Sequence, residues 1–496
     1  MNARRPKKPK LIAVIDIGSN SVRLVVYNGY KRSPETIFNE RVLCGLGAAV
    51  TNKGGMGKKA MARATATLLR FAHLCRNMEV DRIEAVATSA VRDSKNGPEF
   101  IRRIEAGCGF KVKVLSGDAE ARLSALGVVS AFPRASGVVG DLGGGSLELI
   151  AFDGEQTHEK ISLAIGPVRL LAKKEIFTED HVRVVREALA QASWLKKYQG
   201  QPFYMVGGAW RAISHLRIIG TGWPLQALHG YQMTPGEAGE FAEAISRQKP
   251  DDLRTIITLP GRRAVTLPLS AKILSEVIKI LKPKHVLTSA YGLREGLLYQ
   301  SLSKAVRAQD PLIELCRDFG DHKARFENHG DLLKDWIEPL FPGEAKAAAR
   351  IREASCYLAD ISWNAHADFK AELAFTRALV APAVALDHYE RAVIALSLYI
   401  SYNGQPTDRH VEGVVKILSE DHARTAITIG LALRLGQKLT GGTGHPLTLT
   451  RLHLTAGKLK LVVPENEAAL AGDSVRLRLE KLASHIGVRG EINISA

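Results

Sequence analysis

The sequence predicts an α/β protein with two lobes of similar plan, followed by a mainly helical C-terminal domain that ends in a small α/β tail. Three observations predict this fold class. Strand-like apolar segments alternate with helix-like segments as far as about residue 304, helical patterns fill 306–440, and one nine-residue phrase occurs twice, at 16–24 and 141–149. Alternating strands and helices are typical of α/β domains, and the repeated phrase indicates two lobes built alike.

The two lobes are predicted at 11–130 and 131–304, after a basic tail at 1–10 that we expect to be disordered. In the first lobe, periodicity predicts strands near 11–16, 22–27, 83–88 and 112–115 and helices near 57–77, 97–107 and 118–130. In the second it predicts strands near 138–142, 147–152 and 203–206, a helix near 180–198, and helices up to about 302. A ligand is expected in the cleft between two such lobes.

The C-terminal part changes character after about residue 305. We predict a helical domain at 305–440, a Gly-Gly break at 441–442, and a small α/β domain at 441–496. In that last domain 447–454 and 458–463 alternate like the strands of a hairpin, and 474–486 fits an amphipathic helix.

Composition restricts the functional classes. Of 496 residues 46% are hydrophobic and 24% charged, as in globular proteins, and no apolar run reaches the ~18 residues of a membrane span. No signal peptide is evident, and five scattered cysteines without a Cys-x-x-Cys pair argue for a reducing compartment and against zinc. We therefore expect a cytoplasmic protein. The formal net charge of +17 indicates a polyanionic partner, although a basic surface kept for solubility is an alternative.

The repeated phrase reads Asp-apolar-Gly-x-x-Ser-apolar-charge-Leu, and each copy follows an apolar strand. Glycine lets the turn approach a ligand, backbone N–H groups and the serine hydroxyl can bind phosphate oxygens, and the aspartate can hold a cation. The eighth position is Arg23 in one copy and Glu148 in the other. One turn is thus expected to bind an anion and the other a metal or water, the alternative being two surface hairpins.

Three further segments carry candidate residues. Glu120 begins a helix after Ser116, and a carboxylate beside a phosphate can act as a general base; its alternative role is to stabilise the helix dipole, as Asp118 does. Arg92 ends a strand and matches phosphate geometry. The turn Gly207-Gly208 opens a helix, where N–H groups meet an anion.

Together these motifs resemble the exopolyphosphatase / guanosine pentaphosphate phosphohydrolase family, a branch of the actin, sugar-kinase and Hsp70 superfamily. The resemblance covers 11–302 and includes the phrase Ser289–Gly296. It implies two actin-like (ribonuclease H-like) lobes. It also implies Glu120 as the catalytic glutamate with Glu148 as the second candidate, and Mg²⁺ as the cofactor, with room for a monovalent cation such as K⁺. The implied metal site comprises Asp16, Asp141, Gly143 and Glu148. The implied phosphate contacts are Ser19, Asn20, Ser21, Arg23, Arg92, Gly144, Gly145, Ser146, Gly207, Gly208 and Arg263.

The chain departs from this family where long members carry an HD-type helical domain that holds metal with a His-Asp pair. The comparable helix is expected at 357–366 and contains no such pair, while 387–388 and 421–422 read Asp-His instead. We therefore expect an HD-like domain at 305–440 without a clear metal site, which binds the chain-like substrate and forms a homodimer.

The leading functional hypothesis is Mg²⁺-dependent hydrolysis of the terminal phosphate of linear inorganic polyphosphate. Hydrolysis of guanosine pentaphosphate, a nucleotide of the stringent response, is the alternative within the family, with guanosine tetraphosphate as a related ligand. A kinase or ATPase of the same superfamily is disfavoured, because we recognise no segment of this sequence that would bind adenine. A polyphosphate or alarmone sensor is disfavoured by the presence of Glu120, Asp141 and Glu148. Nucleic acid is not expected as a partner, because no binding motif is recognised.

Overall fold

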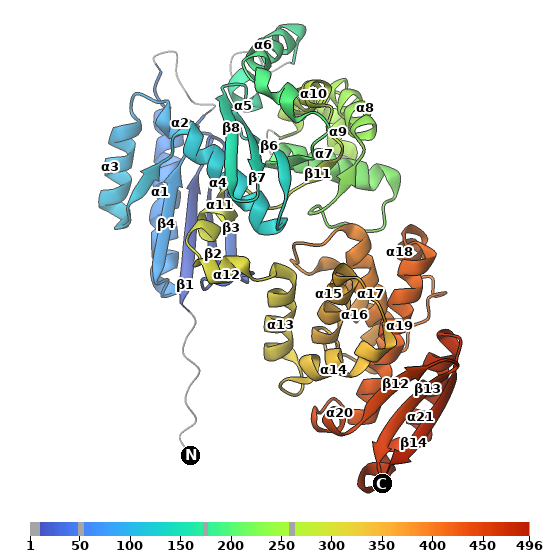
Figure 1. The fold of residues 1–496 in the computed structure, drawn as a ribbon. Helices are drawn as coiled ribbons and strands as arrows, with labels where there is room; N and C mark the ends of the chain where they lie inside the picture. The colour runs from blue at the N-terminus through green and yellow to red at the C-terminus, as the bar shows by residue number, and fades with distance from the viewer. Residues whose placement is uncertain (1–9, 48–53, 172–176, 257–262, 496) are drawn as a thin grey trace. The chain divides into compact units, whose positions relative to one another are not determined.

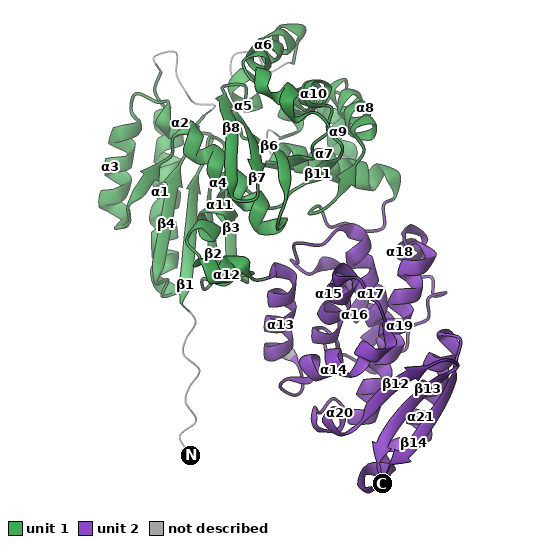
Figure 2. Ribbon diagram, in the orientation of Figure 1, with its two compact units in different colours: residues 1–222, 228–309 green, residues 223–227, 310–496 purple. Residues whose placement is uncertain are grey.

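The computed structural model describes residues 10–47, 54–171, 177–256 and 263–495. They form two compact units, each described here by itself (Figure 2). Unit 1 runs to Gly222 and resumes at Leu228–Gln309, and unit 2 comprises Trp223–Ala227 and the residues from Asp310 onward. Residues 1–9 of the basic tail that we expect to be disordered lie outside the described residues.

The first half of unit 1 contains a five-stranded sheet in the order β3-β2-β1-β4-β5 (Figure 1). Apolar residues of α1 and α3, among them Phe71 and Phe100, pack in one core with the alternate residues of β1, such as Ala13 and Ile15. The elements are β1 (Leu11–Ile17), β2 (Ser21–Asn28), β3 (Thr36–Leu43), α1 (Lys58–Asn77), β4 (Arg82–Ala87), α2 (Ser89–Arg92), α3 (Gly97–Cys108), β5 (Val112–Val114) and α4 (Gly117–Ala131).

The second half contains a six-stranded sheet in the order β10-β11-β9-β6-β7-β8. Its strands are β6 (Ser136–Leu142), β7 (Leu147–Asp153), β8 (Gln156–Leu163), β9 (Phe203–Val206), β10 (Gln232–Met233) and β11 (Val286–Thr288). Its helices are α5 (Pro167–Leu170), α6 (Glu179–Ala190), α7 (Gly208–Thr221), α8 (Pro235–Ser246), α9 (Pro250–Ile256), α10 (Arg263–Leu281), α11 (Leu293–Gln300) and α12 (Lys304–Ala308), with a 3₁₀ helix at Ser193–Tyr198.

The two sheets repeat one plan, which explains the repeated phrase. In each, an antiparallel hairpin continues into a third antiparallel strand, and a parallel strand pairs with the other side of the first strand. Asp16 on β1 lies opposite Arg23 on β2, and Asp141 on β6 lies opposite Glu148 on β7. The eighth position of the phrase therefore always faces its aspartate across the hairpin.

Helix α4 packs against both sheets. Leu123 belongs to a core with Val86 of the first sheet, and Val128 to a core with Val139 of the second. Its partner α11 approaches closely because glycines stand at the crossing: a Cβ on Gly296 would lie 1.8 Å from the Leu123 carbonyl oxygen, and one on Gly127 would lie 2.1 Å from that of Gly292. The first turn of α4, which carries Glu120, is thereby fixed between the lobes.

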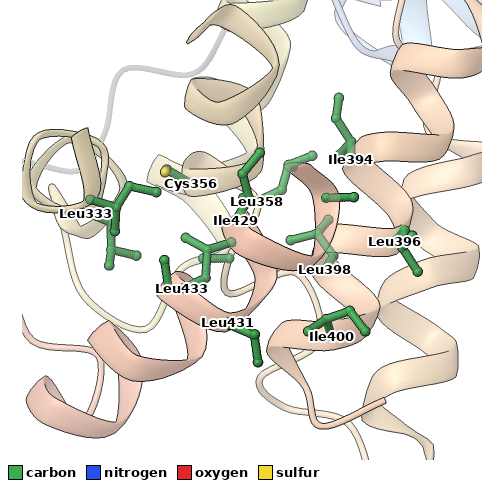
Figure 3. Close-up of a cluster of buried hydrophobic side chains, with 14 of the residues drawn as sticks. Leu333, Cys356, Leu358, Ile394, Leu396, Leu398, Ile400, Ile429, Leu431 and Leu433 are labelled. Atoms are coloured by element: carbon green, nitrogen blue, oxygen red, sulfur yellow. The ribbon is translucent and has the colours of Figure 1, made fainter. Parts of the chain in front are cut away.

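Unit 2 is a helical domain followed by a three-stranded sheet in the order β12-β13-β14. Figure 3 shows part of its core, where Leu396 and Leu398 of α17 and Ile429 and Leu433 of α19 lie in one buried cluster. The helices are α13 (Pro311–Lys323), α14 (His329–Ile337), α15 (Lys346–Tyr357), α16 (Lys370–Val380), α17 (His388–Ser401), α18 (Glu412–Ile417), α19 (Glu420–Thr440), α20 (His445–Leu449) and α21 (Asp473–His485), with 3₁₀ turns at Glu338–Leu340, Ala367–Phe369 and Glu465–Ala471. The strands are β12 (Arg451–Thr455), β13 (Lys458–Pro464) and β14 (Arg489–Ser495).

The predicted fold class is confirmed, with corrections to individual elements. The strand expected at 447–454 is shorter, because α20 takes residues up to Leu449. The helix expected at 357–366 is wrong, since α15 ends at Tyr357. Strands β3, β8 and β14 escaped prediction because they are exposed and lack a continuous apolar run, while β10 and β11 are only two and three residues long.

Candidate active site

The site is a cavity of about 550 Å³ in unit 1, at the ends of the strands that carry the repeated phrase. The cavity is lined by residues from both turns, from the first turn of α4, and from the N-terminal turns of α7, α10 and α11. The predicted site residues among them are Asp16, Ser19, Asn20, Ser21, Arg23, Glu120, Asp141, Gly143, Gly144, Ser146, Gly207, Gly208 and Arg263.

The two turns contact each other directly. A Cβ on Gly145 of the second turn would lie 3.0 Å from the hydroxyl of Ser19 in the first turn. It would also lie 2.7 Å from the hydroxyl of Ser89 at the start of α2, which is itself 3.0 Å from the Ser19 hydroxyl. Glycine at 145 is therefore required for the second turn to approach the first. Gly145 is not among the residues that line the cavity, so its effect is steric.

Backbone hydrogen bonds shape each turn identically. The Gly18 N–H donates to the Ser21 carbonyl at 3.0 Å, and the Gly143 N–H donates to that of Ser146 at 2.9 Å. A third glycine turn reaches the cavity at Gly207, whose φ of +105° only glycine adopts readily and whose Cβ would lie 2.4 Å from the Leu142 carbonyl oxygen. Three such turns at one cavity suit an oxyanion ligand.

Glu120 is buried and lines the cavity. Ser116 caps α4 by accepting from the Ala119 N–H at 3.2 Å, whereas the side chain of Asp118 is 70% exposed beside Lys160. The helix therefore does not need Glu120 as a cap. Burial and the negative charge of Glu148 raise the pKa of Glu120 to about 9, and the Arg92 guanidinium opposes this rise by donating to Glu120 Oε2 at 3.0 Å.

Arg92 acts on Glu120 and is not among the residues that line the cavity. Its Nη1 also donates to the Leu115 carbonyl at 2.9 Å, and its Nε donates to Asp93 at 3.1 Å. These contacts fix the guanidinium beside the glutamate. Arg92, which was predicted to contact phosphate, thus lies where it favours the carboxylate form of Glu120.

Glu148 lies behind the cavity and not on its surface. It is 1% exposed, accepts from the Ser162 hydroxyl at 2.8 Å, and has a pKa raised to about 7 by burial and by the charge of Asp141. Burial also raises the pKa of Asp141, although the Ser124 hydroxyl donates to it at 2.5 Å. Several buried acids with raised pKa values are typical of a site that receives positive charge.

The residues fit a Mg²⁺ ion only in part. In the described ranges no group of three or more His, Cys, Asp or Glu side chains is arranged to hold a metal. Asp16 and Asp141 nevertheless both line the cavity, and Mg²⁺ commonly takes one or two carboxylates together with waters and substrate phosphates. These two aspartates therefore fit as protein ligands of an ion that a phosphate substrate completes. The K⁺ expectation stays a prediction.

Sequence reasoning missed several lining residues, notably Arg41, Thr88, Ser89, Arg211, His215, Thr266 and Arg294. Arg211 and Arg294 lie inside motifs that were recognised, next to Gly207-Gly208 and in Ser289–Gly296, so their proximity to a motif was a usable signal. Arg41 lies on the unpredicted strand β3, opposite Arg23, and gave no such signal.

Unit 2 contributes no comparable site in its described part. The two Asp-His pairs have structural positions: Asp387 caps α17 by accepting from the Glu390 N–H at 2.8 Å, and Asp421 lies in the first turn of α19. No helix of the described residues has the length and apolar character needed to cross a membrane.

A model of the Ppx/GppA phosphatase family matches residues 25–305, which is more than half of the chain. The chain belongs to this family. A second model, described as the C-terminal part of exopolyphosphatase, matches residues 312–492 of this Ppx/GppA family member. The family assignment and the two α/β sheets confirm the predicted resemblance and the actin-like fold.

The chain is also similar to individual proteins and solved structures. Retrograde regulation protein 2 of Saccharomyces cerevisiae is 29% identical over 438 residues, which cover 79% of this chain and 73% of that protein. The solved structure of an exopolyphosphatase-like protein is 25% identical, with a TM-score of 0.51 and coverage of 59% of this chain and 97% of that one. An exopolyphosphatase from Cytophaga hutchinsonii shares the fold, with a TM-score of 0.55 at 24% identity over 59% of this chain and 99% of that one.

Proposed function

We propose that the protein is an exopolyphosphatase that hydrolyses the terminal phosphate of linear inorganic polyphosphate with Glu120 as the general base. The observation that carries this proposal is one cavity in which a buried glutamate, held by Arg92, shares the surface with two phosphate-type turns. Glu120 has no capping task that would otherwise explain it.

In the proposed reaction, the turns at Ser19 and Ser146 hold the terminal phosphate by backbone N–H groups and hydroxyls. Glu120 accepts a proton from a water, whose oxygen forms the new bond to the terminal phosphorus. The phosphoanhydride bond breaks, and the shortened chain leaves with the bridging oxygen. Mg²⁺ bound through Asp16 and Asp141 would offset the negative charge on the phosphates.

A non-catalytic sensor is kept as a second candidate because one relative is named a regulation protein. Guanosine pentaphosphate hydrolysis is kept because the family name covers both activities. The two hydrolases differ in the substrate from which they release phosphate, and the sensor releases none.

The test is phosphate release from long polyphosphate and from guanosine pentaphosphate, with Mg²⁺ and with excess EDTA. We expect release from polyphosphate that stops in EDTA. Glu120→Gln should lower kcat ~100-fold or more with little change in KM, because the amide cannot accept the proton. Asp118→Asn, in the same helical turn but exposed, is the control and should match the wild type.

Each other outcome identifies an alternative. Faster release from the nucleotide than from polyphosphate would favour guanosine pentaphosphate hydrolysis. Tight polyphosphate binding without phosphate release under any condition would favour the sensor. Wild-type turnover in Glu120→Gln would remove Glu120 as the base.

A further inference from the structure

Five arginines line the same cavity, more than the terminal phosphate needs. They come from five different elements, β2, β3, α7, α10 and α11, and we call them the arginine cluster. Its members are Arg23, Arg41, Arg211, Arg263 and Arg294.

Three members of the arginine cluster form hydrogen bonds to neutral groups. Arg23 Nε donates to the Asn39 side-chain oxygen at 2.8 Å, and Arg41 Nε donates to the Ser21 hydroxyl at 2.9 Å. Arg211 donates to the carbonyl oxygens of Ser289 and Ala290 at 3.3 and 3.1 Å. These partners are neutral, so they orient the guanidinium groups and leave their charge available.

Arg294 forms ion pairs with two carboxylates and still has one buried donor without a hydrogen bond. Its side chain is only 14% exposed, and its nearest acidic oxygens, on Asp16 and Glu295, lie 3.7 Å away, beyond hydrogen-bond distance. Within the described residues its Nε has no hydrogen-bond partner. A buried charged donor without a partner is costly, and an anion in the cavity would supply the missing acceptor.

The cationic charges also act on one another. Burial and the Arg294 charge lower the pKa of Arg23, Arg41 and Arg211, the last to about 10. Burial and the Arg41 charge lower the pKa of Arg263. Nearby carboxylates offset this repulsion in part, and Glu295 and Asp16 outweigh burial to raise the pKa of Arg294 itself. The pKa of the other four arginines stays below its ordinary value, so further negative charges would stabilise their charged forms.

Glu120 and the arginine cluster share Asp141 as a charged neighbour but otherwise differ in the charges that act most on them. Burial, Glu148 and Asp141 raise the pKa of Glu120 and Arg92 lowers it, whereas Arg294 is the largest charge effect on three arginines of the cluster. The described residues that line the cavity include no Phe, Tyr or Trp ring on which a nucleobase could stack. The arginines therefore suit phosphate groups better than a nucleoside.

The distribution of charged residues along the sequence also favours binding of a polyanion in this cavity. Basic residues outnumber acidic ones in the part of the chain that contains unit 1, whereas in 310–496 acidic residues slightly outnumber basic ones. The positive excess thus belongs to the unit that holds the cavity.

We propose that the arginine cluster binds the second and third phosphates of a linear chain, so that the cavity holds at least three consecutive phosphates. Bridging phosphates carry about one negative charge each and a terminal one up to about two, which matches a cluster of five cations. Arginine is suited to this because its fork binds two phosphate oxygens at once. The inference rests on the proposed function for the direction of the chain, with its terminal phosphate at Glu120.

The experiment is calorimetric binding of orthophosphate, pyrophosphate and tripolyphosphate to the full chain in excess EDTA, where no hydrolysis is expected and the readout does not depend on turnover. For the wild type we expect affinity to rise steeply with each added phosphate. Arg41→Gln should lose about ten-fold or more in affinity for tripolyphosphate, as for a lost charge-assisted hydrogen bond, with orthophosphate affinity within about two-fold of the wild type. Arg103→Gln, an exposed residue of α3, is the matched control and should bind all three like the wild type.

Arg263→Gln is the second variant, and unchanged melting temperatures check that both variants fold. Equal losses for orthophosphate and tripolyphosphate, or no loss for either, would overturn the proposal. A length-dependent affinity that is lost in Arg41→Gln, in a protein that releases no phosphate, would uphold the subsite while rejecting the proposed hydrolase.

Discussion

At the scale of single residues, the charge state of Glu120 is the result of opposing effects. Burial and Glu148 favour its protonated form, and Arg92 favours the carboxylate. A general base works only as the carboxylate, so activity should rise with pH through the pKa of this group. The burial that isolates Glu120 from bulk water thus also makes it depend on nearby positive charge.

Arg92→Gln is expected to move the ascending limb of the kcat/KM–pH profile to higher pH. Removing the guanidinium removes the hydrogen bond and the charge that lower the pKa of Glu120, so a higher pH is needed to ionise it. The measurement is phosphate release against pH at saturating Mg²⁺. Arg122→Gln, also on α4 but bonded to Gln300, should keep the wild-type limb. A limb that stays in place in Arg92→Gln would contradict control of Glu120 by Arg92.

At the scale of secondary-structure elements, the crossing of α4 and α11 determines where Glu120 lies. The crossing depends on two glycines whose neighbours are backbone atoms and cannot move aside as a flexible side chain can. The same crossing brings the N-terminal turn of α11, with Arg294, to the cavity. Helix packing therefore couples the position of the base to that of the arginine cluster.

Gly296→Ala is expected to destabilise unit 1 by about 1–3 kcal/mol, the range for overpacking, because its Cβ would lie 1.8 Å from the Leu123 carbonyl oxygen. The measurement is the urea midpoint, with kcat as a second readout. Gly236→Ala is the matched helical control, since its Cβ would meet nothing within 4 Å. It should be neutral or stabilising by up to about 1 kcal/mol. Equal midpoints for the two variants would show that the crossing tolerates separation.

At the scale of the whole molecule, the net charge of +17 belongs to the part of the chain that holds the cavity. The expectation that 305–496 binds the chain-like substrate therefore gains no support from charge. The homodimer and the cytoplasmic location stay predictions, and sedimentation would test the dimer.

Binding of long polyphosphate is expected to weaken steeply as salt rises, because each phosphate contact releases counterions. Arg41→Gln should make the slope of log affinity against log salt shallower by about one unit. Arg451→Gln, an exposed arginine on β12 of unit 2, should leave the slope unchanged. A shallower slope in Arg451→Gln together with an unchanged slope in Arg41→Gln would place the polyanion on unit 2.

The sequence by itself determined the features that local rules govern. An aspartate at the end of an apolar strand, a glycine turn after it and a capped helix with Glu120 are all readable within about ten residues, and the structure brings these residues to one cavity. The duplicated phrase also predicted two similar sheets. These inferences held because hydrophobic periodicity and glycine conformations depend mainly on nearby residues.

Only the tertiary structure decided which side chains share the cavity. Arg41, Arg211 and Arg294 come from a β-strand and two helices far apart in sequence, and Glu148 turned out to be buried behind the surface that it was predicted to form. Edge strand β3 carries Arg41 but has no apolar run to reveal it. The physical reason is that burial, mutual charge effects and the choice of neighbours follow from long-range packing, which no local pattern encodes.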